Sequence, residues 1–100
     1  MNLKPGTRGR FHSHFTQESL PLLKRWNIDV VAHGPSLHDE NTYYVIRRFE
    51  SLAHRRQSED AFYDSDDWRN GPREAMVALI ENYTDIVLQL DEAAIQGLRK

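Results

Sequence analysis

The chain has 100 residues, of which 39% are hydrophobic and 28% are charged, and its formal net charge is −2. This length supplies one hydrophobic core, so we expect residues 1–100 to form a single domain. The near-neutral charge excludes a nucleic-acid-coating protein, and the composition excludes a disordered chain. Because the sequence contains no cysteine, disulfides, thiolate metal sites and a cysteine nucleophile are also excluded.

Neither a membrane nor a nucleic acid is an expected partner. The longest apolar runs, such as Ala75 to Ile80, are too short to cross a bilayer, and the polar N-terminus lacks the apolar region of a signal peptide. Three dibasic pairs occur, but acidic residues adjoin them and no platform for base stacking accompanies them. Together with the absence of cysteine, these features predict a cytoplasmic protein.

The first predicted element is a helix from about Arg8 to about Arg25, which follows a turn at Pro5-Gly6 and which Thr7 can cap. Pro21 lies inside this span, where it removes an N–H donor and crowds the preceding turn, so we expect a kink near Ser19 and Leu20. Apolar residues recur along the helix at roughly helical intervals, namely Phe11, Phe15, Leu22 and Trp26.

Two strands are predicted next, from Ile28 to Ala32 and from Thr42 to Phe49, because both runs are rich in β-branched or aromatic residues. The connection from Ser36 to Asn41 is short enough for an antiparallel hairpin. Alternation along the second strand separates two sets of side chains. One set is Tyr43, Val45, Arg47 and Phe49, and the other is Tyr44, Ile46 and Arg48.

The second half of the chain begins with a predicted helix that Ser51 caps and that runs to about Phe62. Its inward residues are expected to be Leu52, Ala61 and Phe62, and the acidic stretch Asp64-Ser65-Asp66-Asp67 supplies caps for a further turn before Trp68.

Gly71-Pro72 then interrupts the chain before another predicted helix, whose apolar stripe is Ala75, Met76, Leu79, Ile80 and Tyr83. The alternating residues Thr84 to Leu90 predict a final strand with one apolar face, and Asp91 is expected to cap a short terminal helix.

The order of elements predicts an α+β fold. One further strand at the start would give the βαββαβ order of ferredoxin-like proteins, in which helices cover one face of an antiparallel sheet. Only Met1 to Lys4 precede the first turn, which is too short for that strand. We therefore expect most of the first strand to be missing from the chain, which would leave the backbone groups of a neighbouring strand unpaired.

Four short motifs resemble, in order and spacing, those of NIPSNAP-family domains. They are Leu3-Lys4-Pro5-Gly6-Thr7, Leu20-Pro21-Leu22-Leu23, Phe49-Glu50-Ser51-Leu52-Ala53-His54-Arg55 and Tyr63-Asp64-Ser65-Asp66-Asp67-Trp68-Arg69. The resemblance covers roughly Leu3 to Leu90, and family members carry a full strand before the first motif. It implies a dimeric α/β barrel in which two copies form a homodimer and pack their sheets face to face.

The family resembles cofactor-independent monooxygenases and related barrel enzymes in fold. The resemblance thus implies a homodimer that binds a small aromatic or anionic molecule without a cofactor, with monooxygenase-like or isomerase-like activity as an expectation. A non-catalytic dimerisation or protein-interaction module is the alternative, and a truncated product with no independent role is a third possibility.

His33 is the candidate catalytic residue. It lies at the end of a predicted strand beside Gly34 and Pro35, where its side chain could reach a cavity between two packed sheets. The imidazole pKa lies near neutrality, which suits a general base. An ordinary polar residue at a strand end is the alternative interpretation.

Five residues are candidates for ligand binding: Tyr43, Tyr44, Arg47, Arg48 and Trp68. On the sheet face turned away from the helices, a tyrosine ring and an arginine fork could bind a planar anion. The same residues could instead pack across a dimer interface, where tyrosine and arginine are enriched. The sequence does not decide which face is which.

No metal site is predicted. His12 and His14 point to nearly opposite sides of the predicted helix, and no histidine pair has the spacing of a helical metal site, so His12, His14, His38 and His54 are interpreted as scattered surface residues. Asp64, Asp66 and Asp67 begin like a calcium loop but lack its later ligand and its glycine, so helix capping explains them.

Overall fold

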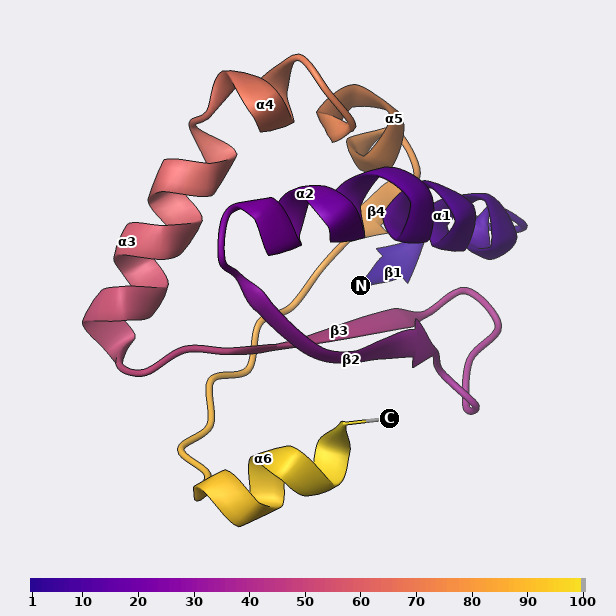
Figure 1. Cartoon of the computed structure of the whole chain (residues 1–100). Coiled ribbons are helices and arrows are strands. Elements are labelled where there is room, and N and C mark those ends of the chain that lie inside the picture. The colour runs from indigo at the N-terminus through magenta and orange to yellow at the C-terminus, as the bar shows by residue number, and fades with distance from the viewer. Residues whose placement is uncertain (100) are drawn as a thin grey trace.

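The computed structural model describes residues 1–99 and has an α+β architecture. Most of the helices lie on one side of short antiparallel strands, and the C-terminal helix lies on the other side of the long hairpin (Figure 1). None of the helices in residues 1–99 is long and apolar enough to span a membrane.

A continuous helical run occupies the first quarter of the chain, as predicted. It consists of α1 (Arg8–His14), the π-helical segment η1 (Phe15–Ser19) and α2 (Leu20–Arg25). The expected irregularity before Pro21 is thus a π-helical segment, which accommodates a residue without an N–H donor. Thr7 precedes the run but its hydroxyl donates to the carbonyl of Lys4 at 2.7 Å and makes no cap, so that detail of the prediction is wrong.

The two long strands form the expected hairpin. Strand β2 (Asp29–Pro35) continues past the predicted end at Ala32, and β3 (Tyr43–Arg48) pairs with it in antiparallel register. His33 stands opposite Val45 in this register, and a bulge interrupts the ladder between Val30 and Ala32.

Strand β1 (Asn2–Leu3) has only two residues and pairs antiparallel with β4 (Ile80–Asn82). On its other side, Asn2 forms a bridge to Thr42, and the N–H of Tyr43 donates to the carbonyl of Met1 at 3.0 Å. The strands therefore form two separate two-stranded sheets, β1 with β4 and β2 with β3, which the bridge from Asn2 to Thr42 joins at one end.

The hairpin separates the two sets of side chains predicted for β3. Tyr43 packs against the helical run, and Arg47 reaches Glu59 of α3 (Leu52–Tyr63) at 3.5 Å, so both lie on the helix-facing side. Arg48 points the other way, where it pairs with Glu92 of α6 (Glu92–Leu98) at 3.0 Å. Helix α6 thus covers part of the face that the other helices leave open (Figure 1).

The middle of the chain forms α3, α4 (Asp66–Arg69) and α5 (Arg73–Val77). Ser51 caps α3 as predicted, and Ser65 caps α4 by accepting from the N–H of Trp68. Phe62 is buried as predicted, but the expected inward residues Leu52 and Ala61 are exposed. The burial of α3 is therefore concentrated near its C-terminal end, where Phe62 contacts Trp26 and Trp68.

The region after Val77 differs most from the prediction. The predicted helix ends earlier than expected, at Val77, so that Leu79 lies in a turn and Ile80 pairs with Leu3 as part of β4. The strand predicted from Thr84 to Leu90 has no regular structure, and its residues are exposed. Asp91 caps α6 as predicted, with its carboxylate accepting from the N–H of Ala94 at 2.8 Å.

The core lies between the helical run and the hairpin. Its buried members include Leu3, Phe11, Phe15, Leu23, Ile28, Tyr43, Phe62, Met76 and Leu79. One polar residue, Ser19 of η1, is buried among the described residues without a hydrogen-bond partner for its hydroxyl. Burying this hydroxyl without a partner costs free energy.

Candidate acid–base site

The phenol of Tyr43 lies between two imidazoles on the helix-facing side of the hairpin. Nδ1 of His12 and Nδ1 of His33 are each 2.8 Å from the Tyr43 hydroxyl oxygen. The ring centroids of the two histidines are 6.1 Å apart. We call His12, Tyr43 and His33 the histidine–tyrosine cluster.

Each member of the cluster comes from a different element. His12 lies on α1 between the core residues Phe11 and Phe15, Tyr43 begins β3, and His33 lies near the end of β2. The ring of Phe15 packs against the His33 imidazole with centroids 4.9 Å apart, which fixes the orientation of that ring. The core packing therefore sets the geometry of the cluster.

The hydrogen bonds of the cluster impose opposite roles on the two histidines. A phenol carries a single O–H donor, so Tyr43 can donate to Nδ1 of only one imidazole. The other imidazole must then carry its proton on Nδ1 and donate to the phenol oxygen. A proton that enters at one histidine can leave at the other when both hydrogen bonds reverse, so the cluster is a potential proton path.

Tyr43 stays neutral over the working range of the histidines. Its side chain is completely buried, and this burial raises the pKa of the phenol to about 12. Burial therefore favours the neutral phenol over the charged phenolate.

Raising the pH above about 10 is expected to destabilise the fold through Tyr43, because the phenol in the unfolded chain ionises near pH 10 and the folded one near pH 12. The contribution of neutral Tyr43 is complete below the lower pKa and falls by roughly 1.4 kcal/mol per pH unit between the two. Urea unfolding of the chain and of Tyr43→Phe at about pH 9 and about pH 11 measures this. If both proteins lose the same free energy over that interval, Tyr43 is not responsible.

A pocket of about 210 Å³ adjoins the cluster, and we call it the His33 pocket. It lies between α2 and β2 and is lined by Leu20, Lys24, Val30, Val31, Ala32 and His33. Four of these residues are aliphatic, so Lys24 and His33 provide its only ionisable side chains. A half-open recess of mixed polarity, with an ammonium and an imidazole, suits a small molecule that carries a negative charge.

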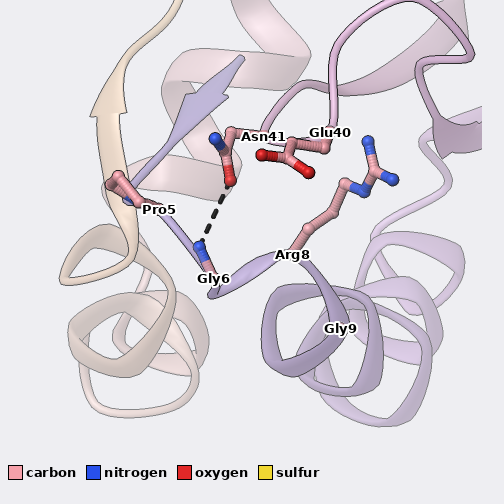
Figure 2. A pocket seen from close by; sticks show the side chains of 6 residues that line it. All are labelled: Pro5, Gly6, Arg8, Gly9, Glu40 and Asn41. Atoms are coloured by element: carbon pink, nitrogen blue, oxygen red, sulfur yellow. Dashed lines mark hydrogen bonds between the residues drawn. The ribbon is translucent and has the colours of Figure 1, made fainter.

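A larger recess of about 400 Å³ lies at the opposite end of the helical run, beside the Pro5-Gly6 turn (Figure 2). Two of its polar side chains are already engaged: Oδ1 of Asn41 accepts from the N–H of Gly6 at 3.2 Å, and Nη1 of Arg8 donates to the carbonyl of Asp39, which lies outside the lining. Arg8 and Asn41 thus tie the turn and the start of α1 to the hairpin loop. The arrangement explains this recess as a structural junction.

The structure divides the residues predicted to bind a ligand. Arg47 lies over the ring of Tyr63 at 5.5 Å from its centroid, and the rings of Tyr63 and Trp68 are 5.3 Å apart. Arg47 and Trp68 therefore belong to one aromatic layer beside α3 and α4, where Arg47 is also paired with Glu59. This layer is separate from the His33 pocket, so the predicted grouping with His33 holds for Tyr43 alone.

Tyr44 and Arg48 lie on the face turned away from α1 and α2. A side chain added at Gly34 would meet the Tyr44 ring, with 3.4 Å between the new Cβ and the phenol oxygen. Arg48 is engaged with Glu92 and so lies beside α6, whereas Tyr44 stands opposite Gly34 at the other end of the ladder. His33 itself faces the helices, whereas the sequence interpretation directed it toward a cavity between two sheets.

Sequence reasoning missed His12 and Lys24. His12 was interpreted as a surface histidine, yet its imidazole reaches the buried Tyr43 phenol. The signal was its position between Phe11 and Phe15, which places it at the border of the buried helical stripe. Lys24 gave no such signal, because its place beside His33 depends on how α2 packs against β2.

Among residues 1–99, no group of three histidine, aspartate or glutamate side chains could hold a metal ion. No protein-family model, curated protein or solved structure matches the chain. The functional argument therefore depends on the geometry of the cluster and its pocket.

Proposed function

We propose that this domain binds a small anionic molecule in the His33 pocket and that His33 transfers a proton to or from it. The observation that carries the proposal is the Tyr43 hydroxyl held at 2.8 Å from both His12 and His33, with His33 also lining a pocket. Such proton transfer is the chemistry of an isomerase or of a cofactor-independent enzyme that begins by deprotonating its substrate.

The proposed catalytic step uses three groups of the chain. Lys24 binds the anionic group of the ligand, and an imidazole nitrogen of His33 takes a proton from an acidic C–H of the bound molecule. His33 then donates a proton to the Tyr43 oxygen while the phenol donates its own proton to His12. Because His12 is exposed, its imidazole exchanges that proton with water.

We further propose that the domain has a ferredoxin-like fold related to the NIPSNAP family. The antiparallel pairs of β1 with β4 and of β2 with β3, the bridge between them, and the packing of α1 and α2 on one face of the hairpin support this, whereas α6 on the other face departs from that arrangement. The motifs that suggested the family lie at structural junctions, since the Pro5-Gly6 turn bonds to Asn41 and Ser51 caps α3.

Benzoate is expected to raise the melting temperature of the protein, whereas benzamide and benzylamine, its neutral and cationic analogues, are expected to have little effect. Lys24→Gln is expected to weaken benzoate binding by about tenfold, because a charged hydrogen-bond donor is lost. Lys4→Gln is the matched control, since Lys4 is exposed and lies outside the pocket. Equal responses to all three compounds, or equal effects of the two substitutions, would contradict the proposed ligand class.

Proton transfer is tested by a separate measurement. Phenylpyruvate carries a carboxylate on one side of a ketone and an acidic benzylic C–H on the other, and the exchange of that hydrogen in D₂O can be followed by NMR. We expect the protein to accelerate this exchange and His33→Gln to lower the acceleration by about a hundredfold. Exchange that is unaffected by His33→Gln would leave a binding protein without this chemistry.

The second candidate function is the non-catalytic interaction module. It is favoured by the exposed apolar segment before α6, in which Ile86 and Leu88 are 79% and 71% exposed. That segment lies outside the His33 pocket, so the two functions make separate predictions.

A further inference from the structure

The segment Thr84–Leu90 exposes an unusual amount of apolar surface. Ile86, Val87, Leu88 and Leu90 are all exposed, with Val87 at 51% and Leu90 at 44%. The segment continues directly from β4 but forms no ladder with another part of residues 1–99. Apolar side chains in this density on an extended segment are typical of an interface.

The sequence of the segment is complementary to itself. In an antiparallel pair with a two-fold axis at Val87, Ile86 of one copy stands opposite Leu88 of the other, and Thr84 stands opposite Leu90. The side chains of these four residues lie on one face of the paired strands. The apolar side chains of one copy therefore contact the corresponding side chains of the other copy on that face. On the other face Asp85, whose carboxylate accepts from Nη2 of Arg55 at 3.5 Å within the chain, stands opposite Gln89 of the partner.

Two other registers of the same segment are less favourable. An axis at Leu88 would bring Asp85 opposite Asp91 and place two carboxylates side by side. An axis between two residues would place the apolar side chains of Ile86 and Leu88 in one copy opposite the polar side chains of Asp85 and Gln89 in the other. The register centred on Val87 avoids both faults.

The chain itself covers the competing surface. Arg99 binds Asp29 through two hydrogen bonds of 2.9 and 2.6 Å, and Arg48 binds Glu92, so α6 is held on the outer face of β2 and β3. Packing of two sheets face to face would have to displace this helix. The segment Thr84–Leu90 ends before α6, which begins at Glu92.

We propose that Thr84–Leu90 is a homodimer interface, in which the segment pairs antiparallel with its counterpart from a second copy about an axis at Val87. Pairing orders the segment into strands that extend β4 across the two-fold axis. The pair is isologous, so it closes the assembly at two copies. The proposal is independent of the His33 pocket, because none of the residues lining that pocket belongs to the segment.

Cysteine cross-linking tests this directly, because the full chain contains no cysteine of its own. In Val87→Cys the two thiols face each other with Cα atoms about 5 Å apart, within the range for a disulfide. In the matched variant Gln89→Cys the two thiols are four residues out of register, about 13 Å apart. Under mild oxidation we expect Val87→Cys to form covalent dimers at least tenfold faster than Gln89→Cys.

Sedimentation of the unmodified chain and of Leu88→Asp completes the test. We expect the unmodified chain to be a dimer and Leu88→Asp to be a monomer with an unchanged circular dichroism spectrum, since Leu88 is exposed and contributes little to the fold. Equal cross-linking of the two cysteine variants would overturn the proposed register. A monomeric unmodified chain at all concentrations would overturn the interface.

Discussion

Replacing Tyr43 by alanine is expected to lower the free energy of unfolding by about 4 kcal/mol. The side chain is completely buried, with its ring 5.1 Å from that of Phe11 and 6.0 Å from that of Phe15. Alanine would leave a cavity at the point where the helical run meets β3. It would also remove the hydroxyl that joins His12 and His33, so the loss combines packing and hydrogen bonding.

The matched variant Tyr43→Phe separates these two effects. It keeps the ring and removes only the hydroxyl, so we expect it to cost about 1 to 2 kcal/mol. Urea denaturation followed by circular dichroism gives both values under one set of conditions. If Tyr43→Phe costs as much as Tyr43→Ala, the packing of the ring contributes little. If it costs nothing, the two hydrogen bonds are not needed for stability.

Replacing Gly71 by alanine is expected to cost about 3 kcal/mol, although only one methyl group is added. A Cβ at this position would lie 2.3 Å from the backbone carbonyl oxygen of Asp67, and a backbone atom cannot move aside as a flexible side chain can. The loop between α4 and α5 would have to shift. That shift would also disturb Asp67, whose carboxylate accepts from Trp26 at 3.0 Å and from Arg25 at 2.9 Å.

Gly9→Ala is the control for this prediction. Gly9 lies in α1, and a Cβ there would have no atom within 4 Å. Alanine favours the helix over glycine, so this variant is expected to gain up to about 1 kcal/mol. Thermal and urea unfolding of both variants measure the contrast. A Gly71→Ala protein as stable as the unmodified chain would show that the loop relaxes freely.

Helices and strands could be predicted from the sequence where the spacing of the apolar residues was compatible with only one kind of secondary structure. Phe11 and Phe15 at helical spacing, and the alternating residues of β3, gave the helical run and the hairpin correctly. The apolar residues from Met76 to Ile80 are compatible with two structures, either one continuous helix or a short helix followed by a strand. The outcome depended on Leu3, a partner far away in the sequence, which pairs with Ile80.

The candidate site shows the same limit. His33 and Tyr43 could be proposed from strand position and residue chemistry, but their link through one hydroxyl requires the three-dimensional placement of α1 against the hairpin. Arg47 and Trp68 were grouped with them because all carry rings or charges. In the structure Arg47 and Trp68 instead pack against Tyr63 in a separate aromatic layer. The local sequence pattern does not predict this contact.

The π-helical segment Phe15–Ser19 makes the site depend on a residue count as well as on residue types. His12 precedes the segment, whereas Leu20 and Lys24, which line the His33 pocket, follow it. Each residue advances a helix by about 100°, so deleting one residue from the segment would rotate α2 relative to α1 by that angle. Lys24 would then turn away from His33 with no functional side chain replaced. In the evolution of such a chain, the insertion or deletion of one residue in this five-residue segment could therefore create or abolish the pocket.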